Sequence, residues 1–288
     1  MTAGRSERTR LASPCLTVDV HPEQGGRIAS IRHLPSGAEL LLQTPWADDD
    51  WTGSAAMPDT GDEWHRRYPG GWHGLLPHAG TARTVDGITQ PFHGEAAWRA
   101  WRIVEQDAQS AVTLGLTLRT VPVEVRREIA VSGDTVTVRQ TLVNLVSRPV
   151  ELTWTEHPAF GPDILAPDTV IILGPDTDPV LRSSTAEPGP AFRTVSVPTG
   201  SARLVTPSRS IAIELAWDPQ IFPYAHVWHE LGSSQGFPWW GQVRTMAVEP
   251  ATRVDTFSPG DPLGPLVVAA GASVTAVTTL RAKSLTID

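Results

Sequence analysis

Hydrophobic and polar residues alternate along most of this chain, with the period of two that is typical of β-strands. In residues 15–22 (CLTVDVHP), Leu16, Val18 and Val20 alternate with Thr17 and Asp19. Helical periodicity is scarce. The alternating pattern predicts further strands within residues 25–42, 110–120, 123–146, 148–160, 169–173, 201–207, 210–217, 241–250 and 272–282.

The predicted strands follow one another through short turns, which favours antiparallel pairing. PSG at residues 35–37 and SGD at 132–134 each join two alternating runs. No repeat of fixed period and no low-complexity linker divides the chain. We therefore expect an all-β fold, a large antiparallel β-sandwich, with residues 13–288 in a single domain and residues 1–12 as a flexible N-terminus.

Three stretches break the alternation: residues 44–80, 157–200 and 217–241. Long irregular segments in a compact domain are often functional, although they could simply close the ends of a sandwich. The third stretch is rich in aromatic residues and directly precedes a predicted strand. Tryptophan offers a flat apolar face that suits stacking on a sugar ring, and core packing is the alternative for most tryptophans. We expect Trp228 or Trp239 to border a ligand.

Composition and charge narrow the class of partner. The net charge of −8 argues against nucleic-acid binding, which needs a basic patch, and favours a small or neutral ligand. No apolar run approaches the length of a membrane span, and no apolar region follows the polar N-terminus as in a signal peptide. The single cysteine, Cys15, excludes an internal disulfide. These features predict a cytoplasmic protein without nucleic-acid or membrane partners.

Residues 153–161 (TWTEHPAFG) place a histidine at the end of a strand. Because side chains alternate, Val150, Leu152 and Trp154 share one face. The other face carries polar residues that end in His157. Such a face beside aromatic loops is either a ligand cleft or an ordinary solvent-exposed surface.

Two further residues have chemistry that could be used. Glu249 follows the apolar residues 246–248, and partial burial would raise the pKa of its carboxyl and make it a better base near neutral pH. Pro250 then ends the strand. His93 directly precedes Gly94, which permits a turn. Taken singly, each could be a structural residue at a strand end or turn.

Taken together, five segments resemble the aldose 1-epimerase (galactose mutarotase-like) family, and residues 222–250 are similar to its less characterised branches. The resemblance runs from about residue 16 to 282 and lies in the order of the motifs. They are GGRIASIRHLPSGAELLL (25–42), GGWHGLLPHAG (70–80), FHGEAAWRAW (92–101), TWTEHPAFG (153–161) and AVEPAT (247–252). The resemblance implies a sandwich with the sugar lying across a concave sheet face.

The resemblance also implies roles for individual residues. Glu249 matches the catalytic base that takes the proton from the C1 hydroxyl. His157 matches the histidine that protonates the ring oxygen, and His93 matches the histidine that holds the ring oxygen or neighbouring hydroxyls. No metal or other cofactor is implied.

The remaining sugar-binding positions are matched less directly. An asparagine–arginine pair of the classical mutarotases would fall in GLLPHAGTAR (74–83), where His78 and Arg83 are the nearest candidates, with Arg67 before them. Asp163 and Asp218 are candidates for the sugar-binding aspartate, and Asp163 is preferred.

The expected function is therefore interconversion of the α and β anomers of a free, neutral or weakly anionic sugar by an aldose 1-epimerase, a carbohydrate-metabolism isomerase that acts as a monomer or homodimer. The main alternative is a non-catalytic carbohydrate-binding protein on the same fold. A sugar lyase or hydrolase is disfavoured because no length is left for an extra domain. Catalysis predicts that Glu249 and His157 face each other across a cleft, about one sugar ring apart.

Overall fold

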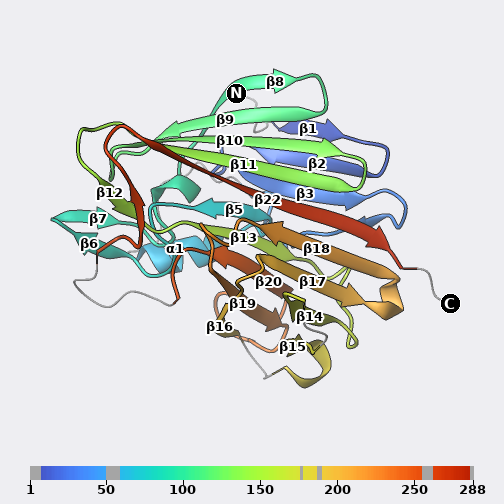
Figure 1. Cartoon of the computed structure of the whole chain (residues 1–288). Coiled ribbons are helices and arrows are strands. Elements are labelled where there is room, and N and C mark those ends of the chain that lie inside the picture. Colours follow the sequence, from blue (N-terminus) through green and yellow to red (C-terminus); the bar gives the residue numbers. More distant parts are fainter. Residues whose placement is uncertain (1–7, 50–58, 176–177, 187–189, 255–261, 286–288) are drawn as a thin grey trace, which may run out of the picture.

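Two antiparallel β-sheets pack face to face in the computed structural model, which describes residues 8–49, 59–175, 178–186, 190–254 and 262–285 (Figure 1). The first sheet has the strand order β1-β2-β3-β5-β13-β20-β19-β16, with β4 beside β3. The second has the order β15-β14-β17-β18-β22-β11-β10-β9-β8. Two small ribbons, β12-β21 and β6-β7, complete the described strands. The predicted antiparallel β-sandwich is confirmed.

The strands of the first sheet are β1 (Thr9–Ala12), β2 (Leu16–His21), β3 (Arg27–His33), β4 (Ala38–Glu39), β5 (Trp72–Leu75), β13 (Thr155–Phe160), β16 (Ala191–Ser196), β19 (Tyr224–Leu231) and β20 (Arg244–Ala251). Those of the second are β8 (Arg102–Asp107), β9 (Ala111–Thr117), β10 (Val123–Ser132), β11 (Thr135–Asn144), β14 (Val170–Leu173), β15 (Leu181–Arg182), β17 (Ser201–Thr206), β18 (Ile211–Trp217) and β22 (Ser273–Ser284). The ribbons are β6 (Arg83–Val85) with β7 (Ile88–Gln90), and β12 (Val150–Leu152) with β21 (Leu266–Val268). The helical segments are α1 (Thr60–Arg67) and the 3-10 turns η1 (Glu95–Ala97), η2 (Ser183–Thr185) and η3 (Pro207–Arg209).

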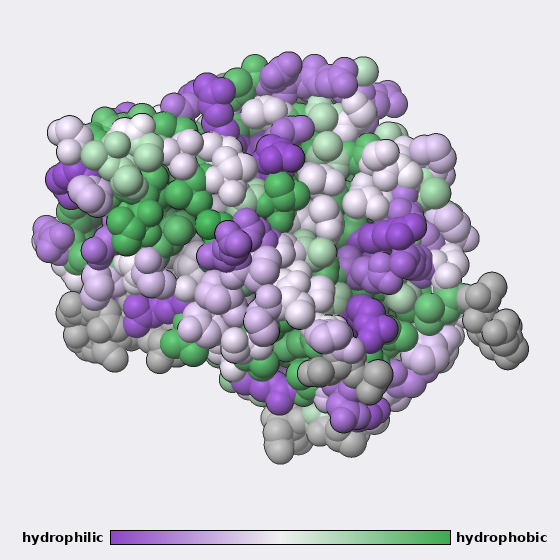
Figure 2. Space-filling view, viewed as in Figure 1, coloured by the Kyte–Doolittle hydropathy of each residue, from purple (hydrophilic) through white to green (hydrophobic). Residues whose placement is uncertain are grey.

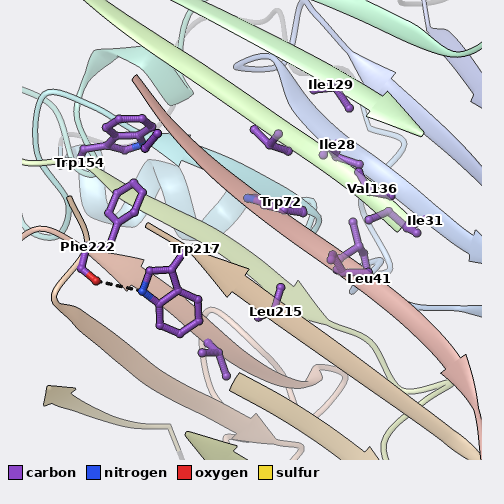
Figure 3. Packing of buried hydrophobic residues seen from close by; sticks show 14 of the residues in the cluster. Ile28, Ile31, Leu41, Trp72, Ile129, Val136, Trp154, Leu215, Trp217 and Phe222 are labelled. Carbon is purple, nitrogen blue, oxygen red and sulfur yellow. Dashed lines mark hydrogen bonds between the residues drawn. The ribbon is translucent and has the colours of Figure 1, made fainter. Parts of the chain in front are cut away.

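The main hydrophobic core lies between the two sheets (Figure 3). Trp72 of β5 and Ile28 of β3 meet Ile129 and Val136 of the second sheet in one buried cluster. A second, smaller cluster that includes Trp64, Leu75 and Trp239 covers the opposite face of the first sheet. The first sheet is therefore buried on both faces in this region, and polar groups on its outer face can be shielded from water.

The outer surface of the sandwich mixes polar and apolar side chains (Figure 2). An apolar area lies at the left of that view, over the end of the sandwich where Figure 1 shows β12. Leu145, after β11, and Val267, on β21 beside β12, are both about half exposed. Neither of these two residues lines the pocket described below.

The structure corrects three expectations of local structure. Residues 9–12 of the predicted flexible N-terminus form β1, paired with β2, while residues 1–7 lie outside the described residues. The stretch 44–80, predicted to be irregular, contains α1. The stretch 217–241 contains β19, whose aromatic and histidine content obscured its alternation. In each case the pairing partner or the tertiary packing overrides a weak local signal.

Candidate active site

A row of polar side chains crosses the outer face of the first sheet. His157 on β13 lies opposite His73 on β5, and the pairs on either side place it opposite Glu249 on β20. Glu249 in turn lies opposite His226 on β19, and His226 lies opposite Thr194 on β16. Directly opposite residues of antiparallel strands share a face, so these five side chains form one continuous line.

A pocket of about 450 Å³ opens over the middle of this row. That volume is within the usual range for small-molecule sites. His157, Glu249 and His226 lie on its sheet side. Trp228 of β19, Thr155 of β13, the nearby Thr153 and Arg253 after β20 also line it. Its remaining walls come from α1 and the turn after it, the β5–β6 connection, the loop before η1, and the segments 190–192 and 238–239; they comprise Trp64, His65, Tyr68, Ala79, Gly80, Thr81, Phe92, His93, Pro190, Phe192, Pro238 and Trp239.

His157 and Glu249 are in direct contact, with 3.5 Å between Nε2 and Oε1. Both side chains are buried. Burial disfavours the charged form of each, lowering the pKa of His157 to about 4 and raising the pKa of Glu249 to about 8. Near neutral pH the pair therefore holds one proton, and burial favours placing it on Glu249.

This contact corrects the expectation that the two groups are separated by about one sugar ring. The reason is the pairing of β13 with β20, which places the two residues opposite each other on adjacent strands. Adjacency is compatible with acid–base work on a sugar, because the C1 hydroxyl and the ring oxygen are attached to the same carbon. One side of the ring can present both atoms to neighbouring groups.

The backbone that carries His157 is anchored from the opposite face of β13. The carboxylate of Glu156 accepts two hydrogen bonds of 2.8 Å from Arg127 on β10, and one each from the indole N–H groups of Trp72 and Trp154. All four side chains are almost completely buried. This network ties the second sheet to the strand that holds His157.

His93 is held in an unusual backbone conformation at the pocket wall. Its φ is +64° and that of Gly94 is +71°. A Cβ on residue 94 would come within 2.3 Å of the carbonyl oxygen of Leu76, so glycine is required there. The His-Gly pair in the sequence is thus explained by a left-handed turn that directs the imidazole toward the pocket.

A backbone hydrogen bond fixes the proton of His93. The N–H of Gly80 donates to Nδ1 of His93 over 2.9 Å. An N–H group can only donate, so Nδ1 is the acceptor and the proton of the neutral ring is on Nε2. Burial also lowers the pKa of His93 well below its usual range. His93 therefore carries a hydrogen-bond donor on Nε2.

Trp228 and Trp239 both line the pocket, with ring centroids 6.0 Å apart. They differ in burial, because Trp228 is half-buried whereas Trp239 is only 5% exposed and belongs to the smaller hydrophobic cluster. Trp228 also lies 6.1 Å from the ring of His157. Trp228 is the better placed of the two to stack on a ligand above His157 and Glu249.

Three residues predicted to bind substrate do not line the pocket. Asp163 lies in the turn that follows the end of β13 at Phe160, and it accepts a hydrogen bond from the N–H of Glu39. His78 sits behind the wall, its ring nitrogens close to the carbonyl oxygens of Ala79 and Pro91. Arg83 is the first residue of β6. Of the connection between β5 and β6, only residues 79–81 line the pocket, and Arg83 lies beyond them.

Three other pocket residues escaped the sequence analysis. His65 comes from the unpredicted α1, and His226 comes from the unpredicted β19. Tyr68 follows α1; its hydroxyl is buried without a hydrogen-bond partner among the described residues. Burial and the charge of Glu249 raise the pKa of Tyr68. The sequence HVWHE (226–230) contained a usable signal for His226. Read as a strand, it places His226 and Trp228 on one face and His229 on the other.

Among the described residues, no three His, Cys, Asp or Glu side chains are arranged to hold a metal ion. Within the same part of the chain, no helix has the length and apolar character needed to cross a membrane.

No protein-family model and no curated protein matches this chain, but solved structures match it over nearly its full length. Slr1438 from Synechocystis sp. PCC 6803 has a TM-score of 0.73 and 17% identity, covering 99% of this chain and 98% of its own. A galactose mutarotase-like protein from Lactobacillus casei ATCC 334 has a TM-score of 0.68 and 16% identity, covering 96% and 100%. The chain has the galactose mutarotase-like fold.

A galactose mutarotase related enzyme from Lactobacillus acidophilus matches as well, with a TM-score of 0.69 and 13% identity, covering 98% of this chain and 99% of its own. The fold predicted from the motif order is thereby confirmed. At these identities the shared property is the galactose mutarotase-like fold, and chemistry has to be argued from the pocket itself.

Proposed function

We propose that this protein is an aldose 1-epimerase that interconverts the anomers of a free monosaccharide or other small sugar. The observation that supports this best is that His157, Glu249 and His93 all line one aromatic-walled pocket. The contact of 3.5 Å between His157 and Glu249 replaces the expected separation across a cleft. An acid and a base in contact can serve two atoms on one carbon. The cytoplasmic location and the monomeric or homodimeric state stay predictions from the sequence.

Ring opening requires that the C1 hydroxyl lose a proton while the ring oxygen gains one. Glu249 takes the first proton and His157 gives the second, which avoids both a free alkoxide and an oxocarbenium-like species. The Nε2–H of His93 holds an oxygen of the sugar in place. The open-chain aldehyde rotates about C1–C2 and closes from its other face.

These roles need the proton on His157, whereas burial favours the neutral pair with the proton on Glu249. The neutral pair and the reactive ion pair each contain one proton. They differ only in whether it is on Oε1 of Glu249 or on Nε2 of His157, which are 3.5 Å apart. A sugar hydroxyl that donates to Glu249 stabilises its carboxylate and shifts the pair toward the reactive form.

The favoured neutral pair also supports a second candidate, a carbohydrate-binding protein without catalysis. If Glu249 keeps its proton when the sugar is bound, it cannot accept one from the C1 hydroxyl. The pocket would then recognise a sugar without opening its ring.

Saturation-transfer NMR of anomer exchange, run on a panel of aldohexoses and aldopentoses, separates these functions. Wild type should accelerate exchange of at least one sugar, and Glu249→Gln should reduce the rate at least a hundredfold while still binding it. Glu39→Gln is the matched control, because burial also raises the pKa of Glu39 but it lies outside the pocket. Binding without accelerated exchange in wild type would leave only the second candidate.

A further inference from the structure

The pocket wall formed by α1 carries a histidine that the proposed reaction does not use. His65 is half-buried and lines the pocket. Its ring lies 5.1 Å from the ring of Phe92 and 5.7 Å from that of Trp239, at 90° to the latter. These contacts on two sides hold the imidazole in one orientation.

A hydrogen bond within α1 fixes the proton of this histidine. Nδ1 of His65 lies 2.7 Å from the carbonyl oxygen of Gly61. A carbonyl oxygen can only accept, so Nδ1 carries the proton and Nε2 of the neutral ring carries a lone pair. Burial lowers the pKa of His65, which favours this neutral form near pH 7. Nε2 has no protein partner among the described residues.

The helix that carries His65 is itself well fixed. Asp59 caps its N-terminus by accepting from the N–H groups of Gly61 and Asp62. The N–H of Phe92 donates to the hydroxyl of Thr60, which joins α1 to the loop that carries His93. The distance between Nε2 of His65, an acceptor, and Nε2 of His93, a donor, is therefore fixed by the fold.

The two imidazoles present opposite hydrogen-bonding character to the same pocket. His93 offers an N–H group, because its Nδ1 faces a backbone donor. His65 offers a lone pair, because its Nδ1 faces a backbone acceptor. A sugar hydroxyl can satisfy either one, but only a group with a hydrogen to donate can satisfy His65.

We infer that His65 is a specificity residue whose Nε2 accepts a hydrogen bond from one unmodified hydroxyl of a neutral sugar. This inference rests on the proposed sugar site but not on catalysis. If that hydroxyl is removed, alkylated or phosphorylated, the lone pair on Nε2 of His65 has no hydrogen-bond donor. A site built to bind a hydroxyl discriminates strongly against an analogue that lacks it.

The test uses the sugar of the panel that binds wild type most tightly, together with its monodeoxyfluoro derivatives. Fluorine accepts weakly but cannot donate. Calorimetry on wild type should reveal one position at which fluorine lowers affinity about tenfold, the size expected for one net hydrogen bond. His65→Leu should lower affinity for the parent sugar by the same factor, with no further loss for that derivative.

Two variants separate recognition from structure. The amide oxygen of His65→Gln can occupy the position of Nε2, so this variant should regain much of the affinity for the parent sugar and again lose it for the derivative. His21→Leu removes a half-buried histidine outside the pocket that also bonds through Nδ1, and should bind like wild type. If the Leu variant does not fold, His65→Phe takes its place, because a phenyl ring can keep the packing against Phe92 and Trp239 but has no lone pair.

The outcomes distinguish this inference from the proposed function. If sugars bind but their anomers are not exchanged faster, the proposed epimerase activity is wrong. The role of His65 can still be tested then, because it depends only on the affinities for the fluorinated derivatives. Equal losses for every derivative in wild type and His65→Leu overturn the role of His65. Tighter binding of a sugar phosphate that strengthens as pH falls would also overturn it, by showing a protonated His65 bound to an anion. Failure of every sugar to bind overturns both.

Discussion

Arg127 of the second sheet donates two hydrogen bonds of 2.8 Å to the carboxylate of Glu156 in the first sheet. Glu156 precedes the candidate acid His157 and points to the opposite face of the same strand. The side chains of Arg127 and Glu156 are both 1% exposed. Gly74, opposite Glu156 on β5, leaves room for the guanidinium, because a Cβ there would lie 2.9 Å from it. The position of the acid is thus set by a contact between the two sheets.

Replacing Glu156 by Gln should destabilise the fold by about 3–5 kcal/mol, because it leaves the Arg127 charge buried without a counter-ion. The measurement is the free energy of unfolding in urea at pH 7. Glu214→Gln is the matched control: Glu214 pairs with Lys283 at the surface, and its loss should cost at most about 1 kcal/mol. Equal effects of the two substitutions would contradict a structural role for the buried pair.

Glu249→Gln should become more stable relative to wild type as pH rises. The pKa of Glu249 is about 8 in the folded protein against an ordinary value of 4.5, so folding favours the protonated form. Between pH 4.5 and 8 the folded state of wild type holds more protons than the unfolded state, and stability falls as pH rises. The neutral amide lacks this loss, giving a relative gain on the order of 1 kcal/mol per pH unit in this window.

Urea unfolding of both proteins at pH 5, 6.5 and 8 measures this difference. A constant offset between wild type and Glu249→Gln across the series would show that the carboxyl is not desolvated in the folded protein. The same curves indicate whether the variant remains folded in the NMR experiment.

The protein should lose stability as pH falls from 6.5 toward 4. Burial lowers the pKa of His78, His157 and His226 to about 4, against an ordinary value of 6.5. In this window the unfolded chain takes up protons before the folded one, so unfolding becomes more favourable. Burial lowers the pKa of His73 and His93 as well. Glu249 and Glu39, whose pKa values burial raises, act in the opposite direction but are two groups against these five.

A urea midpoint that falls between pH 6.5 and 5 is the expected result. Glu249→Gln, which lacks one opposing carboxyl, should show a steeper fall than wild type. A midpoint that rises on acidification would mean that the histidines are more hydrated than their burial indicates.

The two pocket tryptophans should respond differently to truncation. Trp228→Ala is expected to weaken sugar binding several-fold with a small change in stability, because Trp228 is half-buried over the reacting pair. Trp239→Ala should cost about 3–5 kcal/mol, because Trp239 fills the smaller hydrophobic cluster. Calorimetric binding and urea unfolding of both variants test this. The reverse pattern would assign the stacking surface to Trp239.

Alternation in the sequence was sufficient to predict the sandwich and to place His157 on a polar face. It could not show which strands are neighbours, so the contact between His157 and Glu249 and the position of His226 beside them were not predictable. Two turns of helix carry too little periodicity to be recognised, which hid His65. Asp163 was misplaced because the sequence did not show that β13 ends at Phe160 and that Asp163 lies in the turn after it.

The polar row across the first sheet makes the candidate site a property of the whole sheet. His157, Glu249 and His226 line the pocket from three neighbouring strands, and a ligand bound over them would hold those strands together. Such a ligand binds only the folded chain, so mass action adds its binding free energy to the stability of the fold. At a hundredfold excess over Kd the gain is about 2.7 kcal/mol. A shift of the melting temperature by several degrees could therefore identify the sugar before any assay of turnover exists.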